Sequence, residues 1–170
     1  MNRDAIAEAL DSSRVQLLLA LEPLPDEALK APGAAGSWSI ADILAHIVAW
    51  ESELVTALMR IDQGRRPARL LDLDVDAYNA GVVAANKDRD LDRLFDDLQR
   101  VRLQLEEWLE EFSEQQLTRA GYYDWASGKP LWHFIDESSF GHELKHLPDI
   151  RAFVEGWQAA QNPGAGGQEK

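Results

Sequence analysis

Four long segments of this sequence repeat their apolar residues at intervals of three and four, which is the spacing of an amphipathic α-helix. No alternation typical of β-strands continues for more than a few residues, and no internal repeat is present. The sequence therefore predicts an all-α fold, a four-helix bundle. The four helices are expected at about residues 3–21, 40–63, 91–112 and 130–157.

Capping and turn residues mark the connections between these helices. Ser39 is a candidate N-cap of the second helix, and Gly64 follows its end. Asp72 or Asp74 is expected to cap an additional short helix in the connection between the second and third helices. Residues 31–37, rich in Pro, Gly and Ala, are expected to form a loop.

Length and composition predict a single domain. A chain of 170 residues with 45% hydrophobic content is large enough to bury one substantial core without disulfides or a structural metal. We expect the bundle to occupy residues 1–158. Residues 159–170, which include Pro and several Gly, are expected to form a disordered tail.

The charge excludes several classes of partner. Seventeen basic and thirty acidic residues give a net charge of −13, which repels phosphate backbones and anionic lipid surfaces, so neither nucleic acid nor a membrane is expected as partner. The chain contains no cysteine, which excludes disulfides, a Cys-ligated metal and a thiol nucleophile of its own. Since no signal-like or membrane-spanning apolar run is present, a cytoplasmic location is expected.

Two histidines stand one helical turn apart in the fourth predicted helix. A helical projection places His142 and His146 in the middle of its apolar stripe, and a third, His46, on the flank of the apolar face of the second helix. Side chains four residues apart on a helix are close enough for two imidazoles to bind one ion. The pattern predicts a divalent metal held by His46, His142 and His146, with coordination positions left open. The alternative is a buried network of neutral, hydrogen-bonded imidazoles.

Three further features lie near these histidines. Asp42 and Asp149 are candidates to orient the imidazoles through hydrogen bonds, or else solvated charges. Pro148 is expected to bend the fourth helix. His142-Glu143-Leu144-Lys145-His146 also matches the H-E-x-x-H motif of zinc peptidases, in which the Glu is the general base. Because the remaining chain contains no further His, we expect Glu143 to be a solvent-exposed helix residue instead.

Residues 36–51 (GSWSIADILAHIVAWE), together with the later H-x-x-x-H-L-P-D-I of residues 142–150, resemble the DinB/YfiT-like superfamily of metal-dependent four-helix bundles. The resemblance implies that His46, His142 and His146 are the metal ligands. Residues 76–80 and the tryptophan-bearing segment before the fourth helix further resemble the ClbS/DfsB branch. Relatives imply chemistry on small electrophiles, namely thiol transfer with bacillithiol, mycothiol or glutathione, isomerisation of maleylpyruvate, or hydrolysis of a reactive cyclopropane.

The leading functional hypothesis is a divalent-metal-dependent enzyme, with zinc or nickel, that acts on a small electrophilic molecule by thiol transfer or hydrolysis, with a low-molecular-weight thiol as a candidate cofactor. A second hypothesis is a non-catalytic or metal-independent ClbS-like bundle that binds or hydrolyses a toxin. A third is a homodimer that uses the apolar Leu70, Leu71 and Leu73. The candidate substrate pocket comprises Trp38, Trp50, Tyr78, Asn79 and Trp125.

Overall fold

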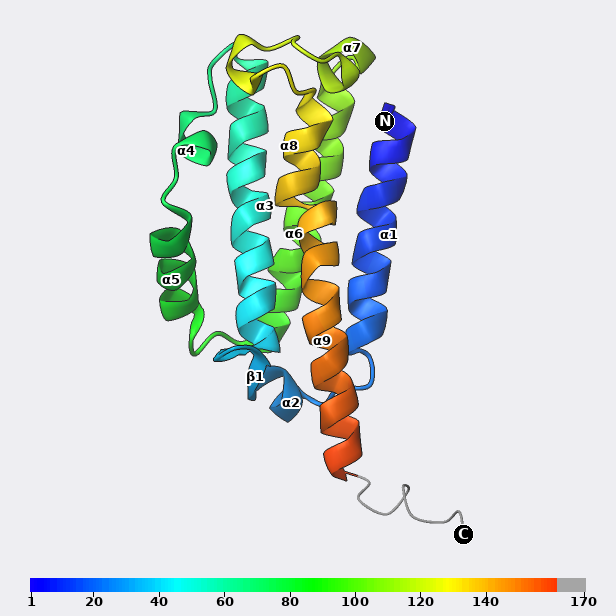
Figure 1. Ribbon diagram of the computed structural model, residues 1–170, viewed down its shortest axis with the longest axis vertical. Helices are drawn as coiled ribbons and strands as arrows, with labels where there is room; N and C mark the ends of the chain where they lie inside the picture. Colours follow the sequence, from blue (N-terminus) through cyan, green and yellow to red (C-terminus); the bar gives the residue numbers. More distant parts are fainter. Residues whose placement is uncertain (162–170) are drawn as a thin grey trace.

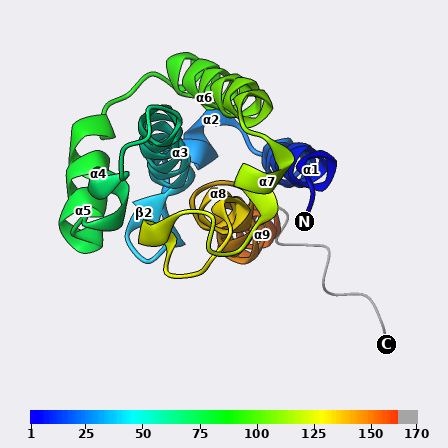
Figure 2. The same ribbon diagram turned by 90° about the horizontal axis from the view of Figure 1, so that it is seen from above.

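The prediction of an all-α bundle is confirmed. In the computed structural model, which describes residues 1–161, four long helical columns pack around a common core (Figure 1). The columns are α1 (Arg3–Leu21), α3 (Ile40–Asp62), α6 (Leu91–Glu111), and the pair α8 (Leu131–Ser138) and α9 (Phe140–Gln161). Viewed from above, α1, α6, α3 and the α8–α9 column surround the core in that order (Figure 2).

Short elements close the two ends and cover one side of the bundle. Between α1 and α3 lie α2 (Asp26–Lys30) and a small antiparallel hairpin, β1 (Pro32–Ala35) with β2 (Trp38–Ser39). The other end carries α7 (Glu114–Thr118) and a 3₁₀ turn (Asp124–Ala126). The connection between α3 and α6 contains α4 (Ala68–Leu71) and α5 (Val75–Asn86), which lie along the outer side of α3 (Figures 1 and 2).

Local sequence signals explain where several helices begin. Ser39 caps α3 and Asp74 caps α5, each with its side chain accepting a hydrogen bond from a backbone N–H of the first turn. Gly64, just beyond α3, has a φ of +71°, a conformation that glycine adopts without steric penalty. Residues 31–37, expected as a loop, instead contain β1, and its partner strand β2 ends at Ser39, the N-cap of α3.

The fourth predicted helix differs from the expectation. It is divided at Ser139, whose φ of −137° and ψ of −101° interrupt the helix between α8 and α9. In contrast, α9 continues through Pro148, where a bend was expected, and onward to Gln161. Residues 159–161 of the predicted disordered tail are thus helical, and the rest of that segment lies outside the described residues.

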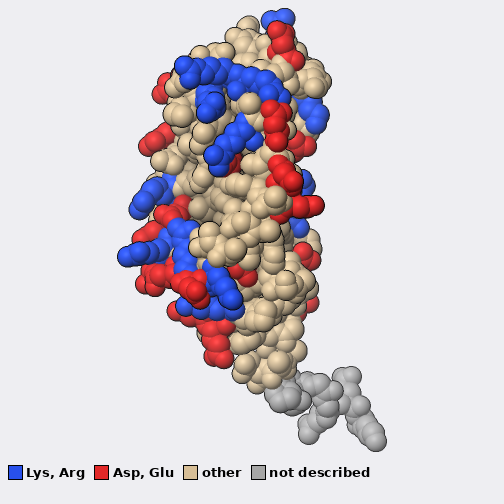
Figure 3. Space-filling view, turned by 90° about the vertical axis from the view of Figure 1, so that its left-hand side faces the viewer, with Lys and Arg blue, Asp and Glu red and all other residues tan. Residues whose placement is uncertain are grey.

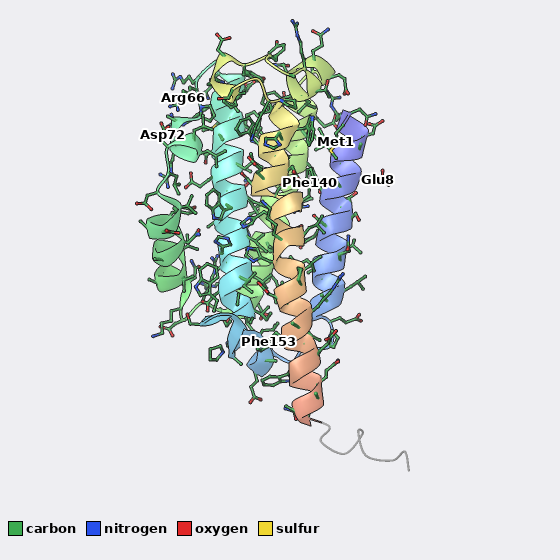
Figure 4. All side chains as sticks on the ribbon, in the orientation of Figure 1. Met1, Glu8, Arg66, Asp72, Phe140 and Phe153 are labelled. Carbon is green, nitrogen blue, oxygen red and sulfur yellow. The ribbon has the colours of Figure 1, made fainter. Side chains whose placement is uncertain are left out.

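The core consists of two apolar clusters separated by a layer of charged side chains. The cluster nearer the hairpin includes Leu17, Leu44 and Ile150, with Phe153 packed against it. The cluster nearer α7 includes Leu54 and Phe140. Figure 4 shows the labelled Phe140 and Phe153 at different heights of α9, consistent with one phenylalanine in each cluster.

The charged layer takes one residue from each column of the bundle. Arg14 of α1 pairs with Glu143 of α9 (Nε to Oε1, 2.6 Å) and with Glu51 of α3 (Nη2 to Oε2, 2.9 Å). Arg102 of α6 pairs with the same two carboxylates, at 2.5 Å to Glu51 and 3.0 Å to Glu143. All four side chains are buried. Two guanidinium groups and two carboxylates balance, so the layer carries no net charge into the core.

The face that carries α4 and α5 has basic and acidic side chains interspersed (Figure 3). Arg66 and Asp72 form an exposed two-bond pair at the outer edge of this connection, where Figure 4 labels them. No helix within residues 1–161 is both long and apolar enough to cross a lipid bilayer.

Candidate metal centre

Three histidines from two helices meet on one side of the bundle. The Nε2 atom of His142 lies 2.9 Å from Nε2 of His46 and 3.1 Å from Nε2 of His146. One nitrogen from each of the three residues falls within 4.8 Å of the others. His46 is buried, whereas His142 and His146 are half-buried. The arrangement joins α3 to α9 across 96 residues of sequence.

The start of α3 places His46. Ser39 and Asp42 form a capping box, in which each side chain accepts a hydrogen bond from the other residue's backbone N–H. This cap fixes the first turn of the helix, and His46 follows Asp42 by one turn. The carboxylate of Asp42 is thereby engaged with Ser39 at 2.8 Å rather than with an imidazole.

The rotation of α9 places the other two histidines. The face of α9 that is buried in the core carries Phe140, Glu143, Leu147, Ile150 and Val154. The prediction placed His142 and His146 at the centre of the buried face. In the structure that centre is displaced by about one residue, to Glu143 and Leu147. The two imidazoles lie at the flank of the buried face, where they reach His46 and remain accessible from a cavity.

The environment keeps the imidazoles neutral at physiological pH. Burial is the main cause that lowers the pKa of His46 to about 4 and that of His142 to about 3. The pKa of His146 is also lowered, again mainly by burial, with Asp149 acting in the opposite direction. Neutral imidazoles have free lone pairs, so a metal ion does not have to displace protons from them near pH 7.

The residues present fit a divalent metal. Tetrahedral zinc at 2.0–2.1 Å from each nitrogen requires ligand atoms about 3.3 Å apart, close to the two Nε2 separations found here. The three Nε2 atoms face one another, and three neutral imidazoles cannot pair every nitrogen within the cluster. The buried Nδ1 atoms of His46 and His142 likewise have no hydrogen-bond partner among residues 1–161. A cation between the Nε2 atoms would satisfy all three lone pairs.

A cavity of about 330 Å³ opens onto the three histidines. Of the predicted pocket residues, Trp50 and Asn79 line it, and the indole Nε1 of Trp50 donates to Asn79 Oδ1 at 3.0 Å. Trp38 packs edge-on against His46, with ring centroids 5.2 Å apart. Tyr78 lies behind Trp50 and donates its hydroxyl to the carbonyl of Ala49.

Trp125 does not reach this cavity. It stacks on Tyr123 and contacts Phe134 near the α7 end of the bundle, where it belongs to the second apolar cluster. The segment that carries Trp125 precedes α8, so the whole of α8 separates it from His142. The position of Trp125 just before the fourth predicted helix did not show that it lies at the opposite end of that helix from the histidines.

Three residues that line the cavity were not predicted. Val75 comes from the first turn of α5, Glu137 from α8, and Lys145 from α9 between two of the histidines. Lys145 is three residues from His142, a spacing that places both on neighbouring faces of a helix, and this signal was available in the sequence.

The expectation that Glu143 is solvent-exposed was wrong. Its side chain is fully buried, and Arg14, Arg102 and Ser13 all contact its carboxylate. Because both oxygens are engaged in the core and Glu143 does not line the histidine cavity, it is not placed to act as the general base of an H-E-x-x-H peptidase. The histidines of that motif meet His46 instead.

Comparison with known families identifies the family of this bundle. The model of the DinB superfamily matches residues 9–150, which is most of the chain and includes all three histidines. The chain belongs to the DinB superfamily. No curated protein matches its sequence.

Two solved structures have the DinB-like fold of this chain. An uncharacterised protein from Escherichia coli UTI89 is 14% identical, with a TM-score of 0.77, and the match covers 92% of this chain and 95% of that one. A Streptococcus pneumoniae protein is 12% identical, also with a TM-score of 0.77, and the match covers 91% of each chain. At these identities the likeness concerns the fold alone.

Proposed function

We propose that this DinB-superfamily protein is a divalent-metal-dependent enzyme that acts on a small electrophilic molecule, by thiol transfer or hydrolysis. The observation that carries the proposal is the convergence of three neutral imidazoles, from α3 and α9, beside a cavity of small-molecule size. Three protein ligands leave coordination positions open, which is the arrangement of catalytic rather than sealed structural sites.

Each part of the cavity has a role in this proposal. His46, His142 and His146 would hold the ion, which when bound supplies a nucleophile by lowering the pKa of a coordinated water or thiol. Since the chain has no cysteine, the thiol in a transfer reaction would be a separate small molecule. Trp50 and Val75 provide apolar surface on one side of the cavity. The amide of Asn79, oriented by the Trp50 indole, faces the substrate space.

Metal binding is the first test. Chelator-stripped protein is titrated with zinc and nickel by calorimetry, and we expect one ion per chain with micromolar or tighter affinity. His46→Ala, His142→Ala and His146→Ala should each weaken binding by at least tenfold. His133→Ala is the matched control, because His133 lies on α8, pairs with Glu137 and is absent from the cluster. Equal affinity in all four variants would exclude the site.

Catalysis is the second test. The metal-loaded protein is incubated with small epoxides, activated cyclopropanes and Michael acceptors, with and without glutathione, bacillithiol or mycothiol, and product formation is followed by mass spectrometry. Turnover that disappears in His142→Ala supports the proposal. Turnover that survives removal of the metal contradicts it.

A metal-independent binding bundle is the second candidate. It is favoured by the aromatic surroundings of the histidines, since Trp38 and Trp50 both pack edge-on against His46. In that case His46→Ala would leave ligand binding intact, whereas Trp50→Ala would abolish it. Under the metal-enzyme proposal, both substitutions reduce activity.

A further inference from the structure

Lys145 places a positive charge beside the three candidate metal ligands, where it disfavours the binding of a cation. It lies on α9 between His142 and His146 and lines the same cavity. Its side chain is exposed to solvent and shares the cavity wall with all three imidazoles, so its positive charge acts on whatever binds beside them. A bound dication would be repelled by it.

No carboxylate neutralises Lys145 at contact distance. Within residues 1–161, no acidic group lies within 4.0 Å of its Nζ atom. Glu137, the acidic residue that lines the cavity, is engaged by His133 at 3.2 Å and by Lys129 at 4.0 Å. Asp136 is close enough for Lys145 to lower its pKa, although burial raises that pKa overall, yet it forms no ion pair with Lys145.

The rest of the cavity favours a small, partly apolar ligand. Trp50 and Val75 offer apolar surface opposite the helix that carries Lys145, and about 330 Å³ limits the ligand to a small molecule. The overall charge of −13 repels anions from the protein as a whole. A local cation beside the metal ligands is what would admit one.

We propose that Lys145 binds the carboxylate of a small ligand whose other end coordinates the metal, so that the substrate or thiol used by this protein is a carboxylate-bearing molecule. This inference rests on the proposed metal site. It adds the chemical class of the ligand. A lysine beside three neutral histidines favours a small molecule whose negative group reaches the lysine while its other end is at the ion. The ion and Lys145 then share the ligand's negative charge, which offsets their mutual repulsion.

The test uses cobalt as a spectroscopic substitute for the metal and a matched pair of thiols. Cobalt-loaded protein is titrated with 3-mercaptopropionate and with 3-mercaptopropanol, and the thiolate-to-cobalt absorption band reports binding. We expect wild-type protein to prefer the carboxylate-bearing thiol by about tenfold, the effect of one charge-assisted contact. Lys145→Met should abolish this preference without weakening cobalt binding, and Lys145→Arg should retain it.

Controls separate the inference from the proposed function. Lys129→Met removes a nearby lysine that does not line the cavity, and it should leave the preference unchanged. Acetate, added as competitor, should displace 3-mercaptopropionate from wild type more readily than from Lys145→Met, which shows whether a carboxylate without a thiol suffices. If cobalt binds but wild type shows no preference, or Lys145→Met keeps it, the inference is overturned and the metal site stands. If wild type binds no cobalt, both fall.

Discussion

At the scale of single residues, the buried histidines make stability depend on pH in a defined direction. In the unfolded chain each His takes up a proton near pH 6.5, whereas in the folded protein the pKa values of His46 and His142 are about 4 and about 3. Between these limits the unfolded state binds more protons, so acidification favours unfolding.

We therefore expect the metal-free protein to lose stability as the pH falls from about 6.5 towards 4. Urea unfolding midpoints, measured in steps across this range, check the prediction. His142→Gln removes one of the titrating groups and should flatten the dependence between pH 6.5 and 5, where most carboxylates are still ionised. Parallel curves for the two proteins would contradict the assignment.

A second prediction at this scale concerns Glu143. Its carboxylate neutralises Arg14 and Arg102 in the core, and Glu143→Gln would leave Glu51 alone against two buried guanidinium groups. Breaking a buried pair in this way costs about 3–5 kcal/mol, and we expect a loss of that size in chemical denaturation. Glu107→Gln, an exposed site on α6, should change stability by about 0.5 kcal/mol or less. A loss as small for Glu143→Gln as for the control would mean that the charged layer is not a stabilising contact.

At the scale of elements, the break between α8 and α9 decides where His142 points. Gly141 lies immediately after this break, and a Cβ atom there would come within 2.2 Å of Asp136 Oδ1 and 2.9 Å of the Asp136 carbonyl oxygen. The carboxylate can turn away, but the backbone oxygen cannot move without shifting the end of α8. The first turn of α9 is thus seated directly on α8.

We expect Gly141→Ala to destabilise the protein by roughly 1–3 kcal/mol and to weaken zinc binding, because the next residue is His142. Gly156→Ala, in the same helix with nothing within 4 Å of the added Cβ, should instead stabilise by about 0.5–1 kcal/mol and leave zinc affinity unchanged. Thermal unfolding and zinc titration of both variants provide the measurement. Similar behaviour of the two glycines would show that the break does not position the ligand.

At the scale of the whole molecule, a metal bound between α3 and α9 would tie together two columns of the bundle that are distant in sequence. A ligand at one hundred times its dissociation constant stabilises the folded state by about 2.7 kcal/mol, which for a protein of this size raises the melting temperature by roughly 5–10 °C. We expect zinc to produce such a shift in wild type and in His133→Ala. In His146→Ala the shift should be absent, and a shift that persists there would place the ion elsewhere.

The architecture was accessible from the sequence because local signals agree with one another. Each of these signals predicts a helix or its beginning without reference to the rest of the chain: the apolar spacing of residues 3–21 and 91–112, the Ser39 cap, and a cap at Asp72 or Asp74, of which the structure uses Asp74. The i, i+4 spacing of His142 and His146 is likewise a local property, so it indicated that the two imidazoles share one side of a helix.

What only the tertiary structure decided is the rotation of α9 about its axis and everything that follows from it. A helix with histidine, glutamate and lysine near its apolar residues has no single unambiguous face, and its rotation is set by its neighbours. Here Arg14 and Arg102 hold the carboxylate of Glu143 in the core. That rotation places His142, Lys145 and His146 on the flank, where they meet His46 and a cavity. The sequence of α9 alone could not reveal it, because the partners of Glu143 that fix it come from two other helices, α1 and α6.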